Sequence, residues 1–182
     1  MKRGCVPFAL VMAPLLALTG CGGIDSTAPT AVGAPASGLQ SPGTVAQHAR
    51  LFFVGPYGNQ MVSRPTDSAY GPQQALDLLV EGPTEAERER GLISQVPPMH
   101  GQLKASGAKG AVDLYVPYRI AEGGLDWTAV SQLACTAASA ELPGDVPPPE
   151  VDVRMHEEGE SQPWTVRCSR LNTAQPAQNQ DG

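Results

Sequence analysis

GPQQALDLLVEGPTEAERERGLISQVPP, from Gly71 to Pro98, is the stretch that decides the fold of this 182-residue chain. It predicts a helix, a tight corner and a second short helical turn. Pro72 marks the helix start, because the first helical position needs no amide hydrogen. Gly82 and Pro83 end the helix, since glycine accepts the left-handed cap conformation and proline cannot continue the hydrogen-bond ladder.

Apolar side chains of this first helix recur at the spacing that gathers them on one face. They are Ala75, Leu76, Leu79 and Val80. Such a face must be covered by other elements. After the corner, Thr84 and Glu87 have capping-box spacing, in which each side chain satisfies a free backbone N–H of the next turn. Gly91 is expected to close that turn. The segment therefore predicts local architecture rather than chemistry.

The run LLVEGPTEAE at 78–87, with the residues that follow it, resembles the signature of the GerMN domain. The resemblance covers roughly 51–168. It implies a membrane-attached protein outside the cytoplasm of Gram-positive bacteria, with sporulation and germination as the family's setting. It also implies an interaction module without catalytic residues. The family positions carried over as structural are Gly82, Pro83, Glu87, Gly91, Ser94 and Pro97.

Strand patterns lie on both sides of this segment. They occupy 51–54, 61–64, 102–106, 112–117, 151–156 and 164–168. Asp126 is placed to cap a second helix, and Trp127 begins its apolar stripe. Trp127 is therefore expected in the core, with a ligand platform as the alternative. Grouped strands with two helices indicate an α+β fold. The expected form is a GerMN-like two-layer sandwich, a mixed β-sheet with both main helices packed on one face.

The start of the chain has the layout of a bacterial lipoprotein signal. Two basic residues precede an apolar run at 6–18, which is too short to span a bilayer comfortably. The run ends in the lipobox Leu-Thr-Gly-Cys at 18–21, which predicts cleavage between Gly20 and Cys21 and a diacylglyceryl group on the Cys21 thiol. Acyl chains such as palmitate would then anchor the protein on the outer face of the cell membrane. An ordinary secretory signal with an incidental cysteine is the alternative.

Composition divides the chain into four expected parts. Residues 1–20 are the signal peptide, and 21–48 hold the lipidated cysteine and a linker rich in Gly, Ser, Thr, Ala and Pro. Such a composition predicts a flexible tether with a reach of roughly 25 to 30 Å. Residues 49–170 form the domain, and 171–182 are expected to be a disordered tail.

The net charge of the chain limits the classes of partner that we expect it to bind. A net charge of −6 without a basic stripe argues against nucleic acid. The expected partners are the membrane, through the lipid on Cys21, and another protein of the cell envelope.

Two of the four cysteines remain once Cys5 leaves with the signal and Cys21 is lipidated. They are Cys135 and Cys168. A surviving pair in an exported protein favours a disulfide, with two buried thiols as the alternative.

Patterns typical of catalysis or of cofactor binding are missing. The three histidines His48, His100 and His156 are far apart and near no cysteine pair, so neither a metal site nor a cofactor is expected. Glutamates at 157–160 suit a solvated turn better than a calcium loop, because the ligand spacing of such a loop is absent. We therefore expect no enzymatic activity, although distant residues could still assemble a triad.

Three functions stay open at this point. The first is an accessory or scaffold lipoprotein in cell-envelope, sporulation or sensor-associated processes, with a charged docking surface at Glu85, Arg88 and Arg90. The second is a lipoprotein that binds a small ligand or a glycan. Its candidate stacking groups are Trp164, Tyr115 and Tyr118. The third is an exported hydrolase. An open sheet edge or a flat apolar patch favours the first function, a deep aromatic pocket the second, and converging carboxylates with shifted pKa values the third.

Overall fold

The decisive segment folds as its sequence predicts in the computed structural model, which describes residues 47–66, 69–99, 102–120 and 123–177. Helix α1 spans Pro72–Val80 and α2 spans Glu85–Glu89. Gly82 and Gly91 have φ angles of 82° and 81°, the left-handed conformation that favours glycine. The expected signal peptide, the lipidated Cys21, the linker up to 46, His100 and the last five residues lie outside the described residues.

The remaining elements are the expected strands and second helix, with η2 and β7 in addition. They are β1 (Gln47–Gly55), β2 (Gly58–Thr66), β3 (Lys104–Ala108), β4 (Ala111–Val116), α3 (Trp127–Ala138), the 3-10 turn η2 (Pro148–Glu150), β5 (Asp152–Glu157), β6 (Trp164–Cys168) and β7 (Ala174–Pro176).

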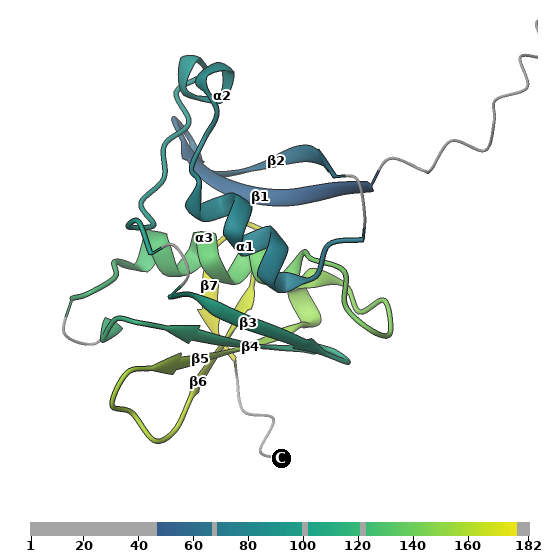
Figure 1. Ribbon diagram of the computed structural model, residues 1–182, viewed down its shortest axis with the longest axis vertical. Helices are drawn as coiled ribbons and strands as arrows, with labels where there is room; N and C mark the ends of the chain where they lie inside the picture. Colours follow the sequence, from purple (N-terminus) through teal and green to yellow (C-terminus); the bar gives the residue numbers. More distant parts are fainter. Residues whose placement is uncertain (1–46, 67–68, 100–101, 121–122, 178–182) are drawn as a thin grey trace, which may run out of the picture. The chain divides into compact units, whose positions relative to one another are not determined.

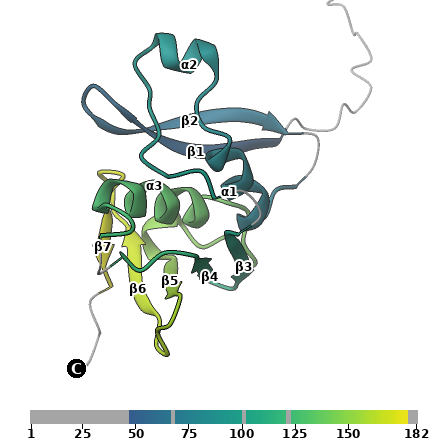
Figure 2. The same ribbon diagram turned by 60° about the vertical axis from the view of Figure 1, so that its left-hand side comes forward.

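A five-stranded sheet forms the base of the fold, in the order β3-β4-β5-β6-β7. It is mixed, because β4 and β5 run parallel whereas the other neighbours are antiparallel. Figures 1 and 2 show α1 and α3 over the same side of this sheet. The side chains that face them are fully buried, among them Val112, Leu114, Val153 and Met155. The expected α+β class with a mixed sheet is confirmed.

Strands β1 and β2 form a separate antiparallel ribbon. The ribbon lies across α1 and α3 from the sheet, so the helices are enclosed between two β layers (Figure 1). The architecture thus has one layer more than the expected two-layer sandwich. The reason lies in β1, where Leu51, Phe52 and Phe53 are all buried. A continuous apolar run reveals burial on both faces, but it does not reveal which sheet the strand joins.

The C-terminal boundary also differs from expectation. Strand β7 pairs with β6 inside the segment 171–182 that composition assigned to a disordered tail. The backbone N–H of Ala174 donates to Ser131 Oγ of α3 at 3.0 Å. This strand is held by backbone pairing with β6 and by the Ser131 hydroxyl. Its sequence therefore has no apolar pattern from which a strand could be predicted. At the other end β1 begins at Gln47, within the expected linker.

Helix α3 starts where Asp126 predicts it, since Asp126 Oδ1 accepts the Ala129 N–H at 2.8 Å. Every residue from Ala129 to Ala138 is buried. Trp127 is 47% exposed, so its expected place in the core is wrong. It occupies the first turn of the helix, where residues 126–128 are exposed.

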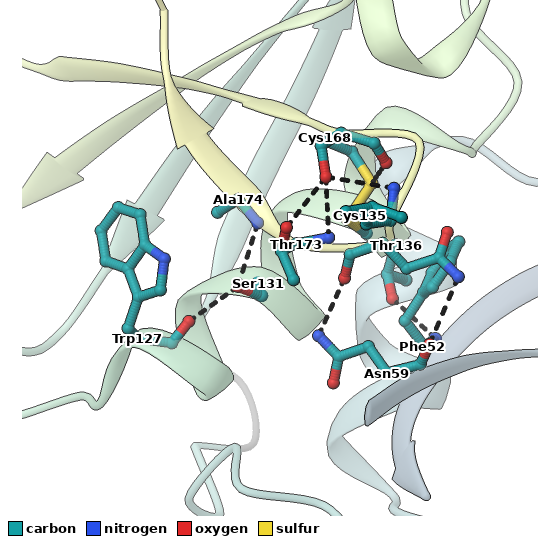
Figure 3. Close-up of a disulfide and its surroundings, with 12 residues drawn as sticks. Phe52, Asn59, Trp127, Ser131, Cys135, Thr136, Cys168, Thr173 and Ala174 are labelled. Atoms are coloured by element: carbon teal, nitrogen blue, oxygen red, sulfur yellow. Dashed lines mark hydrogen bonds between the residues drawn. A yellow bond between two sulfur atoms is a disulfide. The ribbon is translucent and has the colours of Figure 1, made fainter. Parts of the chain in front are cut away.

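The predicted disulfide between Cys135 and Cys168 is present, with an S–S distance of 1.98 Å and a Cα–Cα distance of 4.8 Å. It joins α3 to β6. Figure 3 shows that neighbouring α3 side chains bind two further strands, Ser131 reaching β7 and Thr136 reaching β1. One helix thereby fixes the ribbon and the C-terminal strands in one place.

Candidate functional site

Glu87, in the GerMN-like run of the sequence, is buried and bonded to its neighbours. Glu87 is 4% exposed and accepts hydrogen bonds from Arg64 Nε at 3.1 Å, from Arg64 Nη2 and from the Thr84 N–H at 2.7 Å. Arg64 also donates to the carbonyl oxygens of Gly82 at 2.8 Å and Leu78 at 3.3 Å. Arg64 of β2 therefore fastens the corner between α1 and α2. Sequence reasoning missed it, because no motif joins residues 64 and 87.

Two opposing effects act on the pKa of Glu87. Burial raises it, but the hydrogen bonds from Arg64 and Thr84 and the arginine charge outweigh burial and hold the pKa below its ordinary value. Glu87 is therefore a carboxylate at neutral pH. A permanently ionised, fully bonded carboxylate is suited to fixing structure rather than to exchanging protons.

The rest of the motif connects the segment after α2 to its neighbours. Ile93 exchanges backbone hydrogen bonds of 2.8 and 2.9 Å with Val54 of β1. The Gln95 N–H donates to Gln132 Oε1 of α3 at 2.7 Å, and Ser94 Oγ accepts the Val96 N–H at 3.2 Å. These contacts hold the segment after α2 against β1 and α3.

The expected docking surface lies on α2, which projects beyond the ribbon in Figure 1. Glu85, Arg88 and Arg90 are all exposed. Arg88 Nη1 donates to the Pro83 carbonyl at 2.5 Å and Arg90 Nε to the Ala86 carbonyl at 3.3 Å. Arg90 thus bonds a carbonyl of its own helix, whereas Arg88 bonds the corner before it, and both arginines remain exposed at the surface.

The three expected stacking groups do not meet. Trp164 stacks on Trp127, with ring centroids 6.0 Å apart and an interplanar angle of 24°. Tyr115 lies on the opposite side of the sheet, stacked on His156 with a centroid distance of 4.3 Å. Tyr118 is half-buried and packs against the core. The structure therefore offers a pair made of the exposed Trp127 and the partly buried Trp164, rather than a three-ring platform.

Glu157 holds that tryptophan pair. It accepts the Trp164 indole N–H at 2.5 Å through Oε1 and the Ile120 backbone N–H at 2.8 Å through Oε2. Its neighbour Glu160 forms an ion pair of 2.8 Å with Arg119. The turn expected to be merely solvated therefore fixes an aromatic surface.

The outer side of the sheet carries a polar cluster around Asp113. Its carboxylate binds Arg154 Nη2 at 2.5 Å and His156 Nε2 at 2.9 Å. Burial raises the pKa of Asp113, but the hydrogen bonds and charges of His156 and Arg154 outweigh this effect and lower the pKa. Strands β4 and β5 supply these residues, and no helix of the described part of the chain lies on this side of the sheet in Figures 1 and 2.

A groove runs between the ribbon and the segments that hold η2 and the β6–β7 turn, and we call it the ribbon groove. Its central section has a volume of about 370 Å³, with the disulfide residue Cys168 in its wall. Residues that line this section include Arg50, Phe52, Met61, Pro148, Pro149 and Arg170. A cleft of about 1060 Å³ continues past Arg50, and another of about 740 Å³ continues past Arg170.

The outer edge of β2 borders this groove and is open. Val54 bonds outward to Ile93, and Phe52 bonds outward to side chains of α3. By the alternation of an antiparallel pair, the residues opposite them, Asn59 and Met61, also direct their backbone groups outward, as does Ser63. The Asn59 carbonyl accepts Asn172 Nδ2 at 3.3 Å. Met61 and Ser63 have no backbone partner on this edge within the described part of the chain.

Within the described ranges, no helix is long and apolar enough to cross a membrane. Nor do three or more His, Cys, Asp or Glu side chains of these ranges cluster where they could hold a metal ion.

Comparisons with known proteins give no indication of function, so a function has to be inferred from the residues of this chain. No family model matches the chain, and neither a curated protein nor a solved structure matches it significantly.

Proposed function

We propose that this chain is a membrane-anchored, extracytoplasmic lipoprotein whose GerMN-like domain binds another protein of the cell envelope. In this proposal a diacylglyceryl group on Cys21 holds the protein at the membrane, and the domain beyond the linker makes the contact. Its role is accessory or scaffolding, in cell-envelope, sporulation or sensor-associated processes, and it needs no catalytic group or cofactor.

The open edge of β2 is the observation that carries this proposal. Met61 and Ser63 present unpaired backbone N–H and C=O groups at the surface of a rigid ribbon. An exposed edge of this kind accepts an extended segment of another protein as an additional strand. Pro65 ends the edge on one side because it lacks an N–H, and Asn172 covers it on the other. The docking window is therefore short and defined.

Site-specific crosslinking tests this assignment. A photoreactive amino acid at Ser63 should crosslink a partner in intact cells, because Ser63 is exposed beside the open edge. The same group at Lys104, an exposed position on β3, serves as the control. We expect a discrete crosslinked protein from position 63 and not from position 104. Equal crosslinking from both positions, or none from either, would contradict the proposal.

The membrane anchor has a separate test. Replacing Cys21 with alanine should abolish incorporation of labelled palmitate and move the protein from the membrane fraction to the medium. The matched control is Cys5→Ala, which lies inside the expected signal and leaves the lipobox intact. Undiminished palmitate labelling of the Cys21→Ala protein would contradict lipidation at Cys21.

A second function is favoured by the tryptophan pair. Trp127 is 47% exposed and stacks on Trp164, whose indole is fixed by Glu157. Exposed aromatic faces bind sugar rings, so a glycan is the ligand that fits this surface. Titration with a tetramer of N-acetylglucosamine, followed by tryptophan fluorescence, tests the idea. Trp127→Ala should remove the response, whereas Tyr57→Ala at the β1–β2 turn should not.

A further inference from the structure

We propose that the ribbon groove binds an extended, acidic peptide segment of the partner protein. This inference rests on the proposed function, since it takes the partner to be a protein, and it adds the chemistry by which that partner is recognised. Three features of the groove support it: unpaired arginines, an apolar floor and free peptide groups along one side.

The charge of the central section is the first feature. Arg50 from β1 and Arg170 from the turn between β6 and β7 both line it, and no carboxylate does. Neither arginine forms an ion pair within the described part of the chain, whereas Arg64, Arg154 and Arg167 each pair with a carboxylate. In a chain of net charge −6, this section is a local site of positive charge. Complementary charge attracts and orients an anionic partner.

The floor of the groove is the second feature. Phe52 and Met61 are cross-strand neighbours, and Met61 is 53% exposed. Pro148 and Pro149 line the same section from the η2 side. A ligand that fits this wall buries an apolar side chain between the positions where its carboxylates meet the arginines.

The third feature is the geometry, which favours an extended chain over a small molecule. The central section shares Arg50 with the cleft on one side and Arg170 with the cleft on the other, so the groove continues past both arginines. Met61 and Ser63 offer free N–H and C=O groups beside it. Only an extended backbone pairs with such an edge.

The sign of the charge changes along the groove, which limits the length of the acidic part. Glu141 and Asp145 line the larger cleft, which shares Arg50 with the central section. The positive section therefore accommodates a few residues, not the long phosphate backbone of a nucleic acid. An anionic lipid headgroup would meet the arginines but would leave the edge at Met61 and Ser63 unpaired.

Fluorescence anisotropy with a defined peptide tests the inference. The probe is a fluorescein-labelled octapeptide of alternating glutamate and valine, added to the full chain in neutral detergent micelles. We expect saturable binding that weakens as salt is raised, because exposed charges are screened. The same peptide with glutamine in place of glutamate should bind at least about fivefold more weakly.

Variants of the protein locate the site. Arg50→Gln and Arg170→Gln should each weaken binding by about fivefold. Lys104→Gln removes one positive charge from an exposed position of β3 and should leave binding unchanged. Circular dichroism confirms that each variant is folded. If an arginine variant does not fold, the unaltered chain still decides the matter through its preference for glutamate over glutamine.

Several results would overturn the inference. They are no binding up to about 1 mM peptide, equal affinity for the glutamate and glutamine peptides, and arginine variants that behave like Lys104→Gln. Arginine-dependent binding to phosphatidylglycerol vesicles without peptide binding would assign the groove to a lipid headgroup instead. If position 63 still crosslinks a partner in cells after any of these results, the proposed function stands and only the acidic peptide is excluded.

Discussion

At the scale of single residues, Glu87 shows what the family-like motif does in this chain. Its carboxylate joins the second turn, the corner before it and a strand 23 residues earlier, through Thr84 and Arg64. The motif therefore contains one partner of a buried ion pair. That partner, Glu87, was identified from the sequence, but Arg64 was not. Such a pair is sensitive to loss of either charge, because the remaining charge is left buried and unpaired.

Replacing Glu87 with glutamine should lower the free energy of unfolding by about 3 kcal/mol, since Arg64 would keep its charge without a counter-ion. The matched control is Glu85→Gln, an exposed position of the same helix, which should change stability by no more than about 0.5 kcal/mol. Urea unfolding followed by circular dichroism measures both. Equal effects of the two substitutions would show that the Arg64 contact contributes little.

Asp113 predicts a dependence of stability on pH. Its pKa in the folded protein lies below the ordinary value of 3.8, so the carboxylate contributes stability above pH 3.8 and loses that contribution as the pH falls through the lowered pKa. The unfolding free energy of Asp113→Asn should therefore change less between pH 5 and pH 2 than that of the unaltered protein. Asp145→Asn, at an exposed position, should follow the unaltered protein. Urea unfolding at a series of pH values checks this, and identical acid profiles of all three proteins would refute it.

At the scale of elements, α3 is the connection between layers. Thr136 is fully buried, and its Oγ1 accepts the Phe52 N–H of β1 at 3.1 Å. Gln132 Nε2 donates to the Phe52 carbonyl at 2.9 Å. Side chains of a helix thus complete the hydrogen bonding of a strand edge that no other strand covers at this residue. The same arrangement leaves the edge of β2 as the open one.

Thr136→Val should lower the unfolding free energy by about 1 to 3 kcal/mol, because valine keeps the shape of threonine but leaves the buried Phe52 N–H without an acceptor. Amide hydrogen exchange at Phe52 should become faster. Thr128→Val makes the same change at an exposed position of α3 and should have little effect on either measurement. Unchanged exchange at Phe52 in the Thr136 variant would argue against this connection.

Whether a feature could be predicted from the sequence depends on how far apart in the chain its interacting residues lie. Local or compositional signals predicted several features that the structure contains. They are the helix caps at Asp126 and Thr84, the alternating burial in β5 and the disulfide. The separate ribbon and β7 depend on backbone pairing with distant residues, which leaves no periodic pattern.

The ribbon groove escaped prediction for the same reason. Arg50 and Arg170 are 120 positions apart, and nothing in the sequence connects them before the chain folds.

At the scale of the whole molecule, the ribbon, the helices and the sheet meet around the disulfide. The Cys135–Cys168 bond spans 33 residues of chain and joins α3 to β6 directly under the groove. Replacing both cysteines with alanine should lower the unfolding free energy by roughly 3 to 4 kcal/mol, because the unfolded chain regains the freedom of that loop. Adding reductant to the unaltered protein should produce a similar loss, whereas the double variant should not respond to reductant. If the reduced protein and the variant were as stable as the oxidised protein, the three layers would be held by packing and hydrogen bonds alone.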